Sequence, residues 1–147
     1  MFKDEIASLQ CNPMFKEIDS AKLKLIALTS TRTSYTAGDV IVSQGSPCES
    51  VYFVLEGTAS VVRQEGHKQV LIAELAKGAI FGEIGALLNR SYSSMMVAKT
   101  DVCVLALEKQ IFFDLLNKVP QFSMALMRIM AKRVLDLRSR YVEAQIK

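Results

Sequence analysis

Hydrophobic and polar positions follow different patterns in successive parts of the chain, and each pattern predicts a different kind of structure. In residues 1–30 the apolar side chains recur at roughly helical spacing. Asn12-Pro13 divides this segment, because the residue before a proline avoids the α-helical region. Asp19 or Ser20 is expected to cap a further short helix. Residues 1–30 are therefore predicted to form a helical lead-in.

From residue 31 to residue 108 the apolar runs become short, and glycine-containing turns separate them. Glu56-Gly57 reads as a tight reversal, and residues 64–67 read as a second turn. About eight short strands with a turn signal roughly every ten residues indicate a β-sandwich or barrel, and no alternation of strand and helix is visible. The runs that read as strands are 40–42, 51–55, 58–62, 70–73, 79–81, 95–98 and 102–107.

Helical spacing returns in residues 109–147. A first stripe of apolar side chains ends at Val119-Pro120, and a last helix is predicted from about Gln121 to the end. We expect the first half of this helix to pack on the chain's own barrel and the second half to pair with a second copy, which predicts a homodimer. The apolar positions alternate in steps of three and four, as in a coiled coil, at Met127, Met130, Val134, Leu137, Tyr141 and Ala144.

Composition limits the class of protein. The chain has 147 residues, of which 50% are hydrophobic and 22% charged, so we expect a single domain spanning 1–147. No apolar run approaches the roughly 18 residues of a membrane span, and the acidic start does not resemble a signal peptide. Cys11, Cys48 and Cys103 are too widely spaced for a disulfide framework or a zinc motif, which favours a reducing, cytoplasmic setting. The net charge of +3 gives no reason to expect nucleic-acid binding.

Candidate chemistry centres on residues 79–88, where an apolar run reaches Gly82 and is followed at once by Glu83. Glycine allows backbone N–H groups to approach a ligand, and the free N–H groups at the start of a helical turn suit an anion. A carboxylate accepts hydrogen bonds from hydroxyl groups. A ligand with both an anionic group and hydroxyls, such as a sugar phosphate, fits this pair. The alternative is that Glu83 only serves the dipole of its helix.

Catalytic and metal chemistry find no support in the sequence. His67 is the only histidine and lies in a glycine-containing turn, so neither a metal-binding cupin site nor a Ser–His–Asp arrangement can be built. The chain is therefore not expected to be an enzyme or to hold a metal or a cofactor. The basic residues Lys132, Arg133, Arg138 and Arg140 are interpreted as a solvated helix face.

In their order and spacing these segments resemble a cyclic nucleotide-binding domain, as found in the catabolite activator protein, protein-kinase regulatory subunits and cyclic-nucleotide-gated channels. The resemblance implies an α+β fold, with a double-stranded β-helix (a jelly-roll-like β-roll, residues 31–108) between N-terminal helices (1–30) and C-terminal helices (109–147). The segments that carry it are Asn12-Pro13-Met14-Phe15, Gln44-Gly45, Phe81-Gly82-Glu83-Ile84, Val119-Pro120, and residues 35–41 and 52–57.

The resemblance also implies a ligand site. Backbone N–H groups around Gly82, Ile84 and Gly85 would face the cyclic phosphate, and Glu83 would accept a hydrogen bond from the ribose 2′-hydroxyl. The residues expected to contact the ligand are Phe81, Gly82, Glu83, Ile84, Gly85, Arg90, Ser93, Ser94 and Met95.

The sequence departs from the family at the arginine that pairs with the phosphate. Alignment on Val97 places Ser93 at that position, and Met95 and Met96 where small residues are usual. Loss of a charged hydrogen bond costs roughly 1.5–3 kcal/mol. Three explanations remain open: Arg90, three residues earlier, reaches the phosphate; serine hydroxyls and backbone amides hold it alone; or the pocket no longer binds a cyclic nucleotide.

The sequence thus predicts a regulatory module that binds a cyclic nucleotide, cAMP rather than cGMP, because the additional Ser/Thr that favours guanine is not visible. Binding would be transmitted through the last helix, on which residues 134–141 would cap the base. No DNA-binding domain is expected in this chain. The alternative function is a cyclic nucleotide-binding fold with a degenerate pocket that acts as a dimerisation or protein-docking module.

Overall fold

The computed structural model describes residues 6, 7 and 9–146. Predictions that fall on residues 1–5, 8 and 147 lie outside the described residues. The described helices are α2 (Ser20–Thr29), α3 (Glu83–Leu88), α4 (Lys109–Lys118) and α5 (Pro120–Ile146). The described strands are β1 (Thr31–Tyr35), β2 (Val40–Val42), β3 (Ser50–Glu56), β4 (Ala59–Glu65), β5 (Lys68–Leu75), β6 (Ile80–Phe81), β7 (Met95–Ala98) and β8 (Val102–Glu108).

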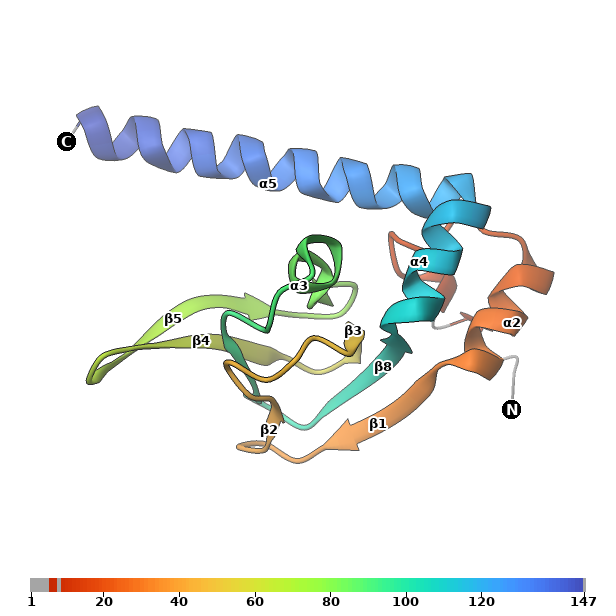
Figure 1. Cartoon of the computed structure of the whole chain (residues 1–147), viewed down its shortest axis with the longest axis horizontal. Coiled ribbons are helices and arrows are strands. Elements are labelled where there is room, and N and C mark those ends of the chain that lie inside the picture. Colours follow the sequence, from red (N-terminus) through yellow and green to blue (C-terminus); the bar gives the residue numbers. More distant parts are fainter. Residues whose placement is uncertain (1–5, 8, 147) are drawn as a thin grey trace.

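The strands form two antiparallel four-stranded sheets that make up a β-roll (Figure 1). One sheet has the order β1-β8-β3-β6, and the other has the order β2-β7-β4-β5. Early strands pair with late ones, as where Thr33 lies opposite Val104, so each sheet is closed only by the return of the chain after α3. The predicted α+β roll of about eight strands is confirmed.

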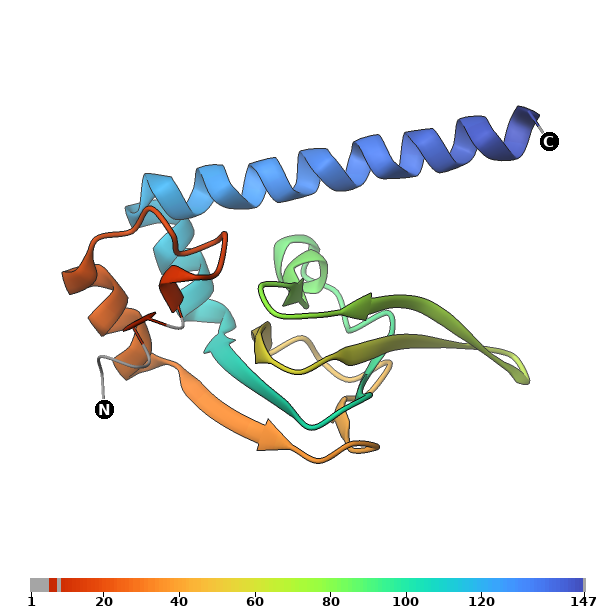
Figure 2. The same cartoon turned by 180° about the vertical axis from the view of Figure 1, so that it is seen from behind.

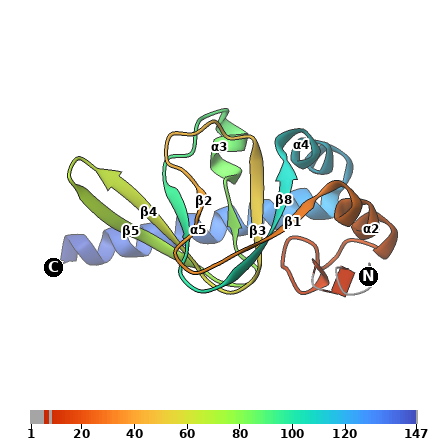
Figure 3. The same cartoon turned by 90° about the horizontal axis from the view of Figure 1, so that it is seen from below.

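Four buried phenylalanines join the lead-in, the roll and the C-terminal helices. The ring of Phe15 lies 4.9 Å from that of Phe53 on β3, measured between centroids. Phe122 of α5 packs on both Phe53, at 6.4 Å, and Phe112 of α4, at 5.9 Å. All four side chains are fully buried. The root of α5 is therefore fixed by the core, at the end of the roll where α2 and α4 also lie (Figure 3).

The helix boundaries follow local signals in the sequence. Asp19 caps α2 by accepting a hydrogen bond from the backbone N–H of Lys22 at 3.0 Å, which confirms the predicted cap. Val119 separates α4 from α5, and Pro120 occupies the first turn of α5, where its missing N–H costs nothing.

The two halves of α5 have different environments. Phe122 and Leu126 are buried, whereas every described residue after Met130 except Arg133 is exposed. Figures 1 and 2 show this second half extending past α3 and over the β4–β5 hairpin. The predicted packing of the first half on the chain's own core is confirmed, and pairing of the second half with a second copy stays a prediction. Among the described helices, none has both the length and the apolar composition that a membrane crossing requires.

The β4–β5 hairpin is longer than predicted. The sequence indicated strands at 58–62 and 70–73, but the ladder continues through Glu65, which lies opposite Lys68. The turn is thereby reduced to Gly66-His67. Backbone hydrogen bonds hold these polar residues in strands although both faces are exposed, so the hydrophobic pattern does not reveal them.

Candidate functional site

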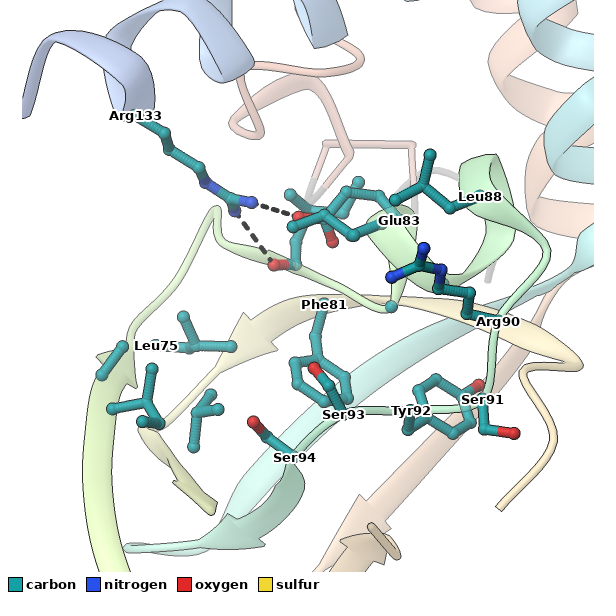
Figure 4. Close-up of a pocket in the computed structure, with 17 residues that line it drawn as sticks. Leu75, Phe81, Glu83, Leu88, Arg90, Ser91, Tyr92, Ser93, Ser94 and Arg133 are labelled. Atoms are coloured by element: carbon teal, nitrogen blue, oxygen red, sulfur yellow. Dashed lines mark hydrogen bonds and ion pairs between the residues drawn. The ribbon is translucent and has the colours of Figure 1, made fainter. Parts of the chain in front are cut away.

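A cavity of about 380 Å³ opens in the β-roll beside α3 (Figure 4). It is bounded by strands β4, β5 and β6, by α3 and the segment that follows it, and by one residue of α5. Its lining residues are Val61, Ile72, Ala73, Leu75, Ile80, Phe81, Gly82, Glu83, Ile84, Gly85, Leu88, Arg90, Ser91, Tyr92, Ser93, Ser94 and Arg133.

All of the predicted ligand contacts except Met95 line this cavity. Met95 is half-buried on β7 and does not appear among the lining residues, whereas its neighbour Met96 is fully buried in the core. Successive strand residues face opposite sides of a sheet, so only one of the two methionines can enter the core. Neither methionine fills the cavity.

Gly82 starts α3 with a backbone conformation that favours glycine. Its φ of 94° lies in the left-handed region. A Cβ at this position would lie 3.0 Å from the carbonyl oxygen of Ser50 and 3.0 Å from Cε1 of Tyr92. Glycine therefore lets this turn pack closely against Ser50 and Tyr92 immediately before the first residue of α3.

Glu83 is buried, with 3% of its surface exposed, and its carboxylate forms an ion pair with Arg133 of α5. The same guanidinium also donates to the carbonyl oxygen of Ile80, at 3.4 Å. Figure 4 shows Arg133 reaching down from α5 to both acceptors. The sequence placed Arg133 on a solvated face, which is wrong for this residue. Its position in the sequence gave no signal of a partner fifty residues earlier.

Arg90 contributes the second guanidinium of the cavity. Its backbone N–H donates to the carbonyl oxygen of Gly85 at 2.8 Å, which fixes the chain at the end of α3. The side chain points toward the cavity (Figure 4), and no ion-pair partner for it lies within the described part of the chain. An unpaired arginine at the edge of an apolar cavity can bind an anion.

Three serines lie on the segment that returns from α3 to β7. Ser93, at the position of the family arginine, is exposed, and Ser94 is buried. Ser91 also lines the cavity, although the sequence did not single it out. Their hydroxyls can donate to an anion or accept from a hydroxyl group.

Tyr92 anchors this returning segment and was also missed from the sequence. Its hydroxyl donates to the carbonyl oxygen of Ser50 at 2.6 Å, and its ring stacks on Phe81 at 5.8 Å with an interplanar angle of 13°. Burial raises the pKa of the Tyr92 phenol, so it remains a neutral donor. Burial likewise raises the pKa of the nearby Cys48 thiol, which keeps that side chain uncharged.

Val61 of β4 and Ile72 and Leu75 of β5 form an apolar wall of the cavity. The cavity can therefore hold a small ligand with an anionic group, a hydroxyl donor and a flat apolar part. The segment predicted to cap the base, residues 134–141, is exposed in this structure, and of α5 only Arg133 lines the cavity. Capping by that segment stays a prediction for a ligand-bound form.

Comparison with known proteins shows to which family the chain belongs. A sequence model described as "Cyclic nucleotide-binding domain" matches residues 32–119, which include β2 to β8 and α4. The chain belongs to the cyclic nucleotide-binding domain family. The resemblance seen in the sequence is thus confirmed, and the family places the chain among regulatory domains.

Curated relatives of this cyclic nucleotide-binding domain occur in different protein architectures. The chain is 30% identical to the cAMP-dependent protein kinase type II regulatory subunit of Drosophila melanogaster over 132 residues, which is 89% of this chain and 33% of that protein. It is 30% identical to the uncharacterized NTE family protein Rv2565 of Mycobacterium tuberculosis over 129 residues, covering 88% of this chain and 22% of that protein. The chain thus spans between a fifth and a third of the length of these relatives.

Solved structures show the same fold. The Thermus thermophilus catabolite activator protein superposes with a TM-score of 0.77 at 26% identity, over 92% of this chain and 62% of that chain. The regulatory subunit of a cAMP-independent protein kinase A from Trypanosoma brucei gives a TM-score of 0.76 at 24% identity, over 99% of this chain and 51% of that one.

Proposed function

We propose that this cyclic nucleotide-binding domain is a sensor that binds cAMP in preference to cGMP and transmits binding through α5. One observation carries the proposal. The unpaired guanidinium of Arg90 and the buried carboxylate of Glu83 line the same cavity, beside an apolar wall. The phosphate of cAMP would meet Arg90, its ribose hydroxyl would meet Glu83, and its base would lie against the apolar wall. The cAMP-dependent kinase regulatory subunit of Drosophila melanogaster, at 30% identity, supports adenine as the base.

In this proposal Arg90 takes the role of the family arginine. Ser93 stands where that arginine is expected, and its short side chain leaves room beside the cavity. Arg90 lies at the end of α3, held by its backbone bond to Gly85, with a long side chain that points toward the same space (Figure 4). The hydroxyls of Ser93 and Ser94 add neutral hydrogen bonds to the phosphate.

Displacement of a fluorescent cAMP analogue tests the role of Arg90. Arg90→Ala is expected to weaken binding about tenfold to a hundredfold, because a charged hydrogen bond to an anion is lost. Arg63→Ala is the matched control, since Arg63 lies on β4 away from the cavity lining and pairs with Glu65. Equal affinities of Arg90→Ala and the control would show that Arg90 does not bind the phosphate.

The proposed sensor is a homodimer. Val134, Leu137 and Tyr141 lie on the exposed half of α5 at coiled-coil spacing and form what we call the apolar seam. Leu137 is 63% exposed and Tyr141 is 67% exposed, which is unusual for side chains of this size. Pairing of two seams would remove these side chains from water.

A second candidate function is that of a dimerisation or docking module whose pocket binds no nucleotide. Two observations favour it. Ser93 stands at the position of the family arginine, and Arg133 forms an ion pair with the Glu83 carboxylate that would otherwise bind the ribose hydroxyl. In this case α5 and its apolar seam would be the functional surface. Saturable binding of cAMP, absent in a variant that lacks Glu83, would rule this candidate out.

A further inference from the structure

A groove of about 150 Å³ lies between the lead-in and the first half of α5. Residues 13–17 line one side of it, and residues 121–132 line the other. Figures 1 and 2 show these two segments side by side. We call this surface the lead-in groove. Among the described residues none lines both this groove and the cavity beside α3, so binding of cAMP in that cavity does not account for it.

The base of the lead-in groove is apolar and rigid. Met14 of the lead-in is 1% exposed, and Ala125 and Ile129 of α5 are partly buried against the core. Both sides of the groove are held by fully or almost fully buried neighbours, Phe15 next to Met14 and Leu126 next to Ala125. The groove therefore has a fixed shape that a partner can recognise without reordering the chain.

Three cationic side chains border this apolar base. Lys16 comes from the lead-in, and Arg128 and Lys132 come from α5, and all three are exposed. Arg128 and Lys132 are four residues apart on one helix face, where like charges repel each other. Within the described part of the chain none of the three has an ion-pair partner. Glu17 is the one acidic side chain among the described lining residues, so the groove carries a net positive charge.

We propose that the lead-in groove is a docking site for a segment of a partner protein that carries acidic side chains beside apolar ones. Carboxylates of this segment pair with Arg128 and Lys132, which relieves the repulsion between the two cations. An apolar side chain of the segment covers Ile129 and Met14. This inference goes beyond the proposed function, because it assigns a protein-binding surface outside the nucleotide cavity.

The size and charge of the groove favour a protein segment over other anionic ligands. Its volume is about 150 Å³, and sites for small molecules usually have at least about 300 Å³. The groove is thus too small for a second nucleotide but has room for side chains of a docked segment. Nucleic acids bind surfaces that are strongly basic, whereas this chain has a net charge of +3 and Glu17 lines the groove.

The test is a selection of random peptides displayed on phage against the whole chain, in the absence of cAMP. Synthetic copies of the enriched peptides are then labelled with fluorescein and titrated by fluorescence anisotropy. We expect enrichment of peptides that contain both acidic and apolar residues. Their affinity should fall as the concentration of sodium chloride rises, because salt screens exposed charges.

The decisive variant is the double substitution Arg128→Gln and Lys132→Gln. It removes two exposed ion pairs and should weaken binding of the selected peptides about threefold to thirtyfold. Arg138→Gln combined with Arg140→Gln is the matched control, because it makes the same change of charge at exposed positions of α5 outside the groove. The control should match the wild type. Thermal unfolding checks that each variant is folded.

Several results would overturn the proposal. The selection would do so if it enriched no peptide, or only peptides without acidic residues. Equal affinities of the double variant and the control would show that the peptides bind elsewhere on the chain. Displacement of the peptides by millimolar inorganic phosphate would indicate a site for a small anion and not for a protein segment. Because the experiment contains no cAMP, failure of the proposed function would leave its result unchanged.

Discussion

The hydroxyl of Tyr92 donates a hydrogen bond to the carbonyl oxygen of Ser50 at 2.6 Å, and the backbone N–H of Ser50 lies 3.3 Å from the same hydroxyl. This contact ties the segment that returns from α3 to the first residue of β3. It also closes the space next to Gly82, whose absent Cβ would touch both partners. The cavity thus keeps its shape through residues that need not contact a ligand.

Replacement of Tyr92 by phenylalanine removes this hydrogen bond and keeps the ring. We expect Tyr92→Phe to lower the free energy of unfolding by about 1–2 kcal/mol, because the partly buried Ser50 carbonyl loses the hydroxyl donor. Burial raises the pKa of the Tyr92 phenol, so the stabilisation is complete below the ordinary tyrosine pKa of about 10 and is lost as the pH rises above it. Urea unfolding at neutral and alkaline pH should show the difference between wild type and variant narrowing. A difference that widened with pH would contradict this account.

Gly82 and Gly38 provide a matched pair for the backbone argument. Both have positive φ, of 94° and 96°, but a Cβ on Gly38 would meet nothing within 4 Å. Gly38→Ala should therefore cost only backbone strain, roughly 1 kcal/mol. Gly82→Ala adds a clash with Ser50 and Tyr92 and should cost about 2–3 kcal/mol or more. Urea unfolding measures both values, and equal losses would show that the space beside Gly82 is not limiting.

Ser93 is the position at which a gain of affinity is expected. Ser93→Arg restores the family arginine on an exposed residue that already lines the cavity. A second guanidinium at the phosphate should tighten cAMP binding by roughly tenfold or more. Ser43→Arg serves as the control, because it places the same charge on an exposed residue that does not line the cavity. Equal affinities of the two variants would indicate a general charge effect and not a restored contact.

The homodimer depends on the apolar seam of α5. Leu137→Glu should raise the dissociation constant of the dimer by roughly thirtyfold or more, since it places a charge in the centre of the seam. Ser139→Glu is the control, because Ser139 is exposed on the same helix but away from the seam positions. Sedimentation velocity at tens of micromolar protein measures the effect. A monomeric wild-type protein at that concentration would contradict the predicted homodimer.

Hydrophobic pattern predicted the elements that bury one face and missed those that do not. The runs at β3 and β8 were evident because their side chains are almost entirely buried. The sequence did not single out β1, Thr31–Tyr35, because its residues are polar and mostly exposed, and its place is fixed by pairing with β8. The length of the β4–β5 hairpin was underestimated for the same reason, because the residues near its turn are exposed and are held only by pairing between the two strands.

The candidate site was predictable where its residues are consecutive. Residues 81–85, Arg90, Ser93 and Ser94 line one cavity as expected, because they belong to a single turn, helix and return segment. Arg133 was not predictable as a member of the site, since its contact with Glu83 depends on the direction of α5. Tyr92 gave only a weak signal, as an aromatic residue among serines. Its role depends on a hydrogen bond to Ser50 of β3, which the sequence does not show.

Isothermal titration of the purified protein with cAMP and with cGMP tests the central claim most directly. The account predicts saturable binding at one site per chain, tighter for cAMP than for cGMP, and strongly weakened by Glu83→Ala. Absence of heat, together with an unchanged melting temperature in the presence of either nucleotide, would contradict it. The fold would then serve its second candidate function, through partners of α5.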